Sequence, residues 1–68
     1  MSARSITPRQ LEIVPLVAQS VPRKVIAARL GISFKTVEYH LAQLDKWLGG
    51  HDPALITRFA LREHLIDL

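Results

Sequence analysis

The sequence predicts an all-α domain built from four helices. The chain has 68 residues, which is enough for one domain at most. Turn-forming residues divide it into four stretches, and within each stretch apolar residues recur at helical spacing. No stretch alternates apolar and polar residues as a half-buried strand would. We therefore expect a single domain over residues 1–68, with helices at about 8–19, 22–30, 34–48 and 53–63.

The first expected helix has a strong start signal and one irregular position. Thr7 can cap it, Pro8 suits the first helical position, and Gln10 can complete a capping box. Pro15 lacks an N–H and clashes with the carbonyl four residues earlier, so it should kink or shorten the helix. We expect the helix to persist with a bend.

The second expected helix lies between Pro22 and Gly31, the usual placement of these two residue types at helix ends. Its expected buried residues are Val25, Ile26 and Leu30. Ser33 is a good N-cap for the third helix, and Gly49 follows that helix. The third helix carries an apolar stripe made of Val37, Leu41, Leu44 and Leu48. Opposite this stripe, the outward residues are Lys35, Thr36, Tyr39, Ala42, Gln43 and Lys46.

The fourth expected helix starts with Asp52 as cap and Pro53 as first residue. It has apolar residues on two sides, and the second row is Leu61, Leu65 and Leu68. This row either packs against a partner or folds back onto the first helix, and the sequence favours neither alternative. His64 stands where the helix should end, and histidine enters the left-handed region more readily than most residues.

The excess positive charge lies in the middle of the chain. Residues 20–48 contain five basic and two acidic residues, whereas the basic and acidic residues elsewhere balance. A basic patch attracts a polyanion, although a basic solvent-exposed surface without a partner is an equally open interpretation of charge alone.

The second and third helices form a recognisable unit, because two helices joined by a short glycine-containing turn make a helix-turn-helix. In such a unit the second helix enters the major groove of DNA. The outward side chains of residues 34–48 include donors, acceptors, an aromatic ring and cations that can reach phosphate. This composition suits a DNA-binding surface better than an ordinary solvated one.

Three motifs resemble a known family, the DNA-binding domain of LuxR/GerE-type (NarL-like) transcription regulators. Residues 6–14 are similar to its opening "LTPRExEVL", and residues 26–33 to its centre "IAxxLxIS". Lys35-Thr36-Val37 with His40 matches "KTVxxH". The resemblance runs from Ile6 to about Ile66 and implies a four-helix domain that binds double-stranded DNA as a homodimer, in the cytoplasm at the bacterial nucleoid.

The resemblance, together with the outward face, assigns roles to individual residues. The expected phosphate contacts are Arg23, Lys24, Lys35, Thr36 and Lys46. The expected base-reading residues are Glu38, Tyr39, Ala42 and Gln43. The expected dimer contacts are Leu61, Leu65 and Leu68. His40 matches a frequent family histidine, with either a phosphate contact or a structural role.

Several residues depart from the family pattern. Glu38 stands where Lys or Arg is frequent; a carboxylate there can accept from cytosine N4 or weaken binding by repulsion. Ala42 can offer only a methyl contact, for example to thymine. Pro22 replaces the usual Ser or Thr cap, and Trp47 replaces a basic residue. These changes bear mainly on which DNA sequence is bound.

Other functions find little support. The chain has no Cys, and its three His residues are spread over two expected helices and a loop. We therefore expect no enzyme, metal site or cofactor. The chain has no apolar run of membrane-spanning length and no signal peptide, so we expect a cytoplasmic protein. It is either part of a longer regulator or a small protein controlled by its concentration or a partner.

The serious alternative is a diverged helix-turn-helix that binds a regulatory protein, as an adaptor or antiactivator, instead of DNA. Trp47 and the leucine row of the last helix could provide such a surface, since Trp is a favoured interface anchor. Salt dependence separates the two functions, because binding through phosphates weakens steeply as salt rises.

Overall fold

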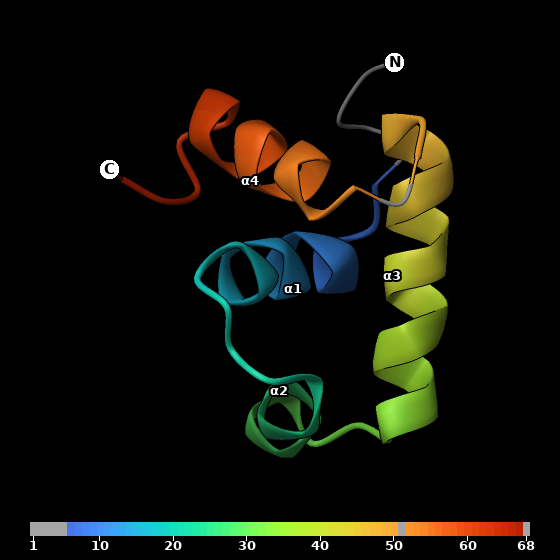
Figure 1. Ribbon diagram of the computed structural model, residues 1–68. Helices are drawn as coiled ribbons and strands as arrows, with labels where there is room; N and C mark the ends of the chain where they lie inside the picture. The colour runs from blue at the N-terminus through green and yellow to red at the C-terminus, as the bar shows by residue number, and fades with distance from the viewer. Residues whose placement is uncertain (1–5, 51, 68) are drawn as a thin grey trace.

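The computed structural model describes residues 6–50 and 52–67, which contain four helices and no strand. In chain order these are α1 (Pro8–Ala18), α2 (Arg23–Leu30), α3 (Phe34–Leu48) and α4 (Pro53–Arg62) (Figure 1). The predicted all-α fold of four helices is confirmed. The bounds of α3 are those expected, α1 and α4 each end one residue earlier, and α2 begins one residue later because Pro22 is its N-cap.

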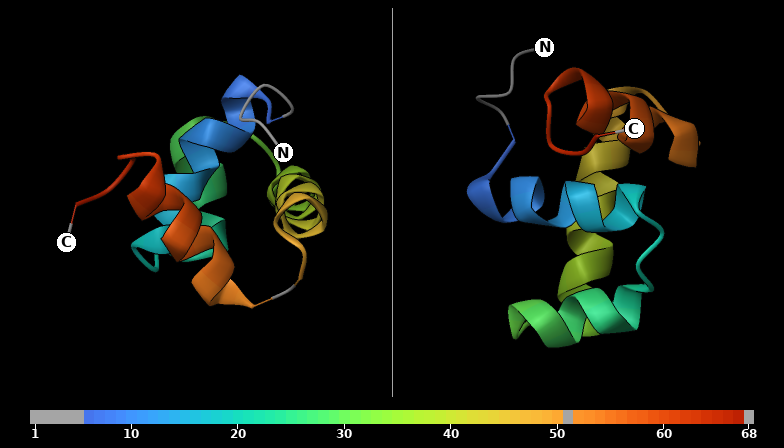
Figure 2. Two further views of the ribbon diagram at one scale, coloured as in Figure 1. Left: turned by 90° about the horizontal axis from the view of Figure 1, so that it is seen from above. Right: turned by 90° about the vertical axis from the view of Figure 1, so that its left-hand side faces the viewer.

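The longest helix, α3, runs along one side of the molecule, and the other three helices pack beside it (Figures 1 and 2). Helices α4 and α2 lie toward opposite ends of α3, with α1 between them. Helix α1 therefore contacts all three other helices, most extensively α4. This arrangement separates the helix-turn-helix end of the molecule from α4.

All four helices contribute to one apolar core. The largest side chains with no exposed surface are Ile13, Val14, Ile26, Val37 and Leu44. Helix α4 adds Ile56, Phe59 and Ala60. The buried residues of α3 are Val37, Leu41 and Leu44, so its predicted apolar stripe does face the core, with Leu48 partly buried at the end.

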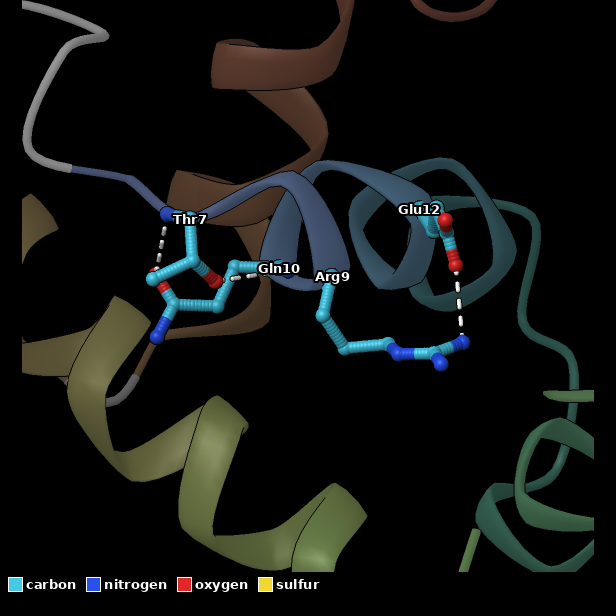
Figure 3. A network of polar contacts seen from close by, with 4 residues as sticks. All are labelled: Thr7, Arg9, Gln10 and Glu12. Atoms are coloured by element: carbon cyan, nitrogen blue, oxygen red, sulfur yellow. Dashed lines mark hydrogen bonds and ion pairs between the residues drawn. The ribbon is translucent and has the colours of Figure 1, made fainter. Parts of the chain in front are cut away.

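The start of α1 is built as expected. The Thr7 hydroxyl accepts from the Gln10 backbone N–H, and the Gln10 side-chain oxygen accepts from the Thr7 N–H, both at 3.1 Å (Figure 3). Two residues further along, at the surface of the same helix, Arg9 and Glu12 form an ion pair at 2.9 Å (Figure 3). The helix continues through Pro15 to Ala18, in agreement with the expectation that proline does not end it.

The expectation that Val25 is buried is wrong, because its exposed fraction is 38%. Successive residues of an α-helix are rotated by about 100° about its axis. Val25, Ile26 and Ala27 therefore cannot all be buried in a helix that packs on one side. Helix α2 buries Ile26 and Ala27, and packs Leu30 partly against the core. Val25 is therefore left facing outward.

Each helix is followed by a residue with left-handed backbone conformation. These residues are Ser20, Gly31, Gly49 and His64. After α4, the His64 N–H donates to the Leu61 carbonyl and the Leu65 N–H to the Ala60 carbonyl, which is the Schellman pattern. The left-handed conformation expected for His64 is thus present, with φ at 59°.

This turn decides where the second leucine row goes. It returns the chain so that Leu65 packs, partly buried, against the protein's own core, as the fold-back alternative describes. Leu61 is half-buried but is not among the residues packed on the core. Leu68 lies outside the described residues.

We expect glycine and non-glycine residues at these turns to respond oppositely to substitution. His64→Gly should raise the free energy of unfolding by about 1 kcal/mol, because the left-handed conformation is unfavourable for residues with a Cβ. Gly31→Ala should lower it by about 1 kcal/mol through backbone strain alone, since a Cβ there meets no atom within 4 Å. Urea unfolding measures both changes. A destabilised His64→Gly variant would contradict this account of the turn.

Candidate nucleic-acid interface

The turn between α2 and α3 is fixed by backbone and side-chain hydrogen bonds. Gly31 takes the left-handed conformation that ends α2, and the Ile32 N–H donates to the Ala27 carbonyl at 3.0 Å. Ser33 then caps α3, its hydroxyl accepting from the Thr36 N–H at 3.1 Å. Ile32 packs partly buried against the core. The direction in which α3 leaves α2 is therefore set by three consecutive residues.

The surface of α3 opposite the core carries a second stripe at helical spacing. Its exposed members, here called the exposed stripe, are Lys35, Tyr39, Ala42 and Lys46. The Tyr39 side chain is its aromatic member and is 60% exposed. Thr36 and Gln43 flank the exposed stripe and are half-buried. The outward face predicted from the sequence is thus present, with polar, aromatic and cationic groups along one line.

The Thr36 hydroxyl is already engaged inside the protein. It lies 2.8 Å from the Ser33 hydroxyl, and either group can donate in that bond. Two hydroxyls have two hydrogens, and the bond between them uses one, so one remains for an external acceptor. The pair can therefore still donate to an anion at the start of α3.

Arg23 and Glu38 are joined directly, which sequence reasoning missed. Arg23 Nη1 donates to Glu38 Oε2 at 2.5 Å, and the two side chains are 54% and 38% exposed. The pair links the first turn of α2 to the second turn of α3, beside the exposed stripe. Only the packing of α2 on α3 brings together residues that are 15 positions apart in the chain.

The remaining predicted phosphate contacts are exposed cations. Lys24 lies in the first turn of α2, and Lys35 and Lys46 lie near the two ends of α3. Within the described ranges, the two ion pairs are Arg9–Glu12 and Arg23–Glu38, so these three lysines have no acidic partner among the described residues. Their charge is available to a polyanion.

His40 has a structural contact with α1. Gln10 is buried, and its Oε1 accepts from the Thr7 N–H, so the Gln10 Nε2 must be the group that faces His40. That Nε2 lies 3.4 Å from His40 Nδ1, which must accept. The His40 ring in turn contacts the Tyr39 ring edge-on, with centroids 5.6 Å apart. A hydrogen bond and an aromatic contact therefore connect the cap of α1 to the exposed stripe.

The described part of the chain contains neither a metal-binding cluster nor a membrane-spanning helix. Within residues 6–50 and 52–67, no three His, Asp or Glu side chains come close enough together to bind a metal ion. None of the described helices combines the length and apolar character needed to cross a membrane. Trp47, the candidate anchor for a protein partner, is half-buried.

The fold and this surface define the chain as a helix-turn-helix domain. The family model described as "Bacterial regulatory proteins, luxR family" matches residues 4–60. The chain belongs to this family. It is thereby a DNA-binding domain of transcription regulators, and the family is not one of enzymes.

Two relatives show how far the similarity extends. The oxygen regulatory protein NreC of Staphylococcus carnosus (strain TM300) is 36% identical over 64 residues, which cover 94% of this chain and 30% of that protein. NreC of Staphylococcus aureus (strain JH9) is 36% identical over 62 residues, covering 91% of this chain and 29% of that protein. The chain thus spans less than a third of the length of these relatives. No solved structure matches it significantly.

The contact with Gln10 predicts the tautomer of His40. Because Nδ1 accepts from an amide, the neutral ring should carry its hydrogen on Nε2. Gln10→Glu should move the hydrogen to Nδ1, since a carboxylate can only accept. The ¹⁵N chemical shifts of the imidazole, measured where the ring is neutral, distinguish the two forms. An Nδ1-protonated ring in the unsubstituted protein would exclude the proposed contact.

Proposed function

We propose that this domain binds double-stranded DNA in a sequence-specific manner as a transcription regulator, with α3 in the major groove. The observation that carries the proposal is the exposed stripe, which stands opposite the buried stripe on a helix held by a short, hydrogen-bonded turn. A recognition helix needs this combination, since one side must anchor it while the other reaches base edges.

The spacing of the cations supports docking of α3 across the groove. Lys35 and Lys46 lie 11 residues apart, which corresponds to about 16 Å along a helix axis. The major groove is about 12 Å wide, so these lysines can approach the phosphates on its two sides. Lys24, Arg23 and the hydroxyl of Thr36 add phosphate contacts near the start of α3.

Between the two lysines lie the groups proposed to read bases. Tyr39 offers a hydroxyl and a ring, and Ala42 a methyl group that suits the methyl of thymine. Gln43 can donate and accept at once, as adenine recognition requires. Glu38 can only accept, so it favours a base that presents an amino group. These four side chains differ in chemistry, which gives the domain a means of distinguishing base pairs.

We further propose that two copies associate through α4. This helix lies at the end of α3 away from α2, so a contact there leaves both turns free to meet DNA (Figure 1). Leu61 is the described residue of the leucine row that is not packed on the core. Leu65 would contribute to this interface indirectly, because its packing on the core holds the turn that follows α4. A homodimer of this kind binds two half-sites about one helical turn apart.

We propose that the domain acts at DNA in the cytoplasm, and its membership of a family of bacterial regulatory proteins supports this. The relatives are named as oxygen regulatory proteins, and the present domain corresponds to about 30% of the S. carnosus protein. We propose the same general role, regulation of transcription through DNA, and take no particular signal from those names.

The first test of the proposal is the salt dependence of DNA binding. Affinity for a duplex should fall linearly on a log–log plot against salt, and Lys35→Ala should reduce the slope by about 1 while weakening all sequences alike. Fluorescence anisotropy at several salt concentrations measures both. Arg62→Ala, an exposed cation at the end of α4, is the matched control and should change little. No salt-dependent binding to any duplex would favour a protein-binding module instead.

The second test concerns the dimer. Leu61→Glu should remove association without unfolding the domain, because Leu61 is not part of the core. Sedimentation equilibrium reports the association, and circular dichroism reports the fold. Leu65→Glu should unfold or strongly destabilise the domain, because Leu65 packs on the core. An unchanged oligomeric state in the Leu61→Glu variant would show that this leucine lies outside any interface.

A further inference from the structure

We propose that Arg23 is a positioning residue for Glu38, and that this pair selects a base with an exocyclic amino group at one position of the DNA site. The inference rests on the DNA-binding function proposed above and names a determinant of its specificity. Such amino groups in the major groove are the 4-amino group of cytosine and the 6-amino group of adenine.

The geometry leaves one carboxylate oxygen for the base. Arg23 Nη1 contacts Glu38 Oε2 at 2.5 Å, and no hydrogen bond to Oε1 comes from any described residue. The Glu38 side chain is 38% exposed and lies next to Tyr39, at the side of the exposed stripe that faces α2. Oε1 can therefore reach the edge of a base that contacts the exposed stripe and accept a hydrogen bond from it.

The chemistry of a carboxylate makes the contact selective. An ionised carboxylate only accepts hydrogen bonds, so the amino groups of cytosine and adenine can donate to it. Guanine and thymine present acceptor oxygens at the corresponding edge, which a carboxylate repels. Discrimination therefore comes from rejection of two bases as much as from attraction of the others.

Arg23 restricts the conformation of the Glu38 side chain, which is long and partly exposed. An unheld Glu38 would sample several rotamers and could turn away from the groove. The guanidinium has five N–H donors in a fixed plane, and the side chain is 54% exposed, so donors remain for a phosphate while one holds Glu38. A phosphate contact and a base contact are then connected through one arginine.

The local charge supports orientation as the main role of the pair. Arg23 and Glu38 together carry no net charge, so the pair adds little to the general attraction of the domain for DNA. Lys24, the next residue of α2, has no acidic partner among the described residues and can serve phosphate alone. Loss of Arg23 should therefore change the base preference, whereas loss of Lys24 should weaken binding to all sequences alike.

The experiment compares base preferences, which a purely structural role or phosphate role would not alter. The unsubstituted domain and the variants Glu38→Ala, Arg23→Ala, the double variant and Lys24→Ala are each used to select from a pool of randomised duplex DNA. The unsubstituted domain should prefer cytosine or adenine at one position by about tenfold, and sequencing identifies which. Glu38→Ala and Arg23→Ala should both lose that preference, and the double variant should lose no more.

Lys24→Ala is the matched control, with weaker binding to all sequences and the preference intact. Circular dichroism melting should show every variant folded, since both side chains of the pair are partly exposed and neither belongs to the core. An Arg23→Ala variant that keeps the preference would restrict Arg23 to phosphate contact and overturn the inference. So would a domain that binds duplexes with no preference dependent on Glu38. Absence of binding to any duplex would instead refute the proposed function itself.

Discussion

The burial of one side of α3 is the constraint on which the rest of this structure depends. Val37, Leu41 and Leu44 lock that side against the core contributed by the other helices. A helix anchored in this way cannot rotate about its axis without exposing these side chains, at a cost of about 1.5–3 kcal/mol for each fully buried one. The exposed stripe on the opposite side is therefore presented in a single orientation. Recognition of a groove requires that kind of fixed presentation.

Polar contacts between helices refine what the core establishes. The Gln10–His40 contact connects the cap of α1 to α3, and the Arg23–Glu38 pair connects α2 to α3. Exposed ion pairs contribute little to stability, about 0–1 kcal/mol, so the significance of the second contact lies in geometry. Both contacts converge on residues adjacent to Tyr39. The aromatic side chain of the exposed stripe is thus flanked by side chains with defined partners.

Local signals predicted most of the fold, because caps and turns depend on residues close together in the chain. Thr7, Ser33 and Asp52 cap helices as expected, and His64 takes its left-handed conformation. Tertiary packing explains what was missed. Val25 was expected inside, but α2 turns another side to the core. The Arg23–Glu38 pair joins two helices, and no spacing rule within one helix could indicate it. The leucine row was ambiguous because only the turn after α4 determines that Leu65 folds back.

Amide chemical-shift mapping tests the central claim, that the exposed stripe of α3 is the DNA-binding surface, most directly. The ¹⁵N-labelled domain is titrated with random-sequence duplex DNA at low salt, where phosphate contacts bind without a defined site. The account predicts that the largest shifts fall on Lys35, Tyr39 and their neighbours in α3 and on the first turn of α2, with α4 unaffected. Shifts concentrated on α4 and around Trp47 at the end of α3, with the exposed stripe unchanged, would contradict it.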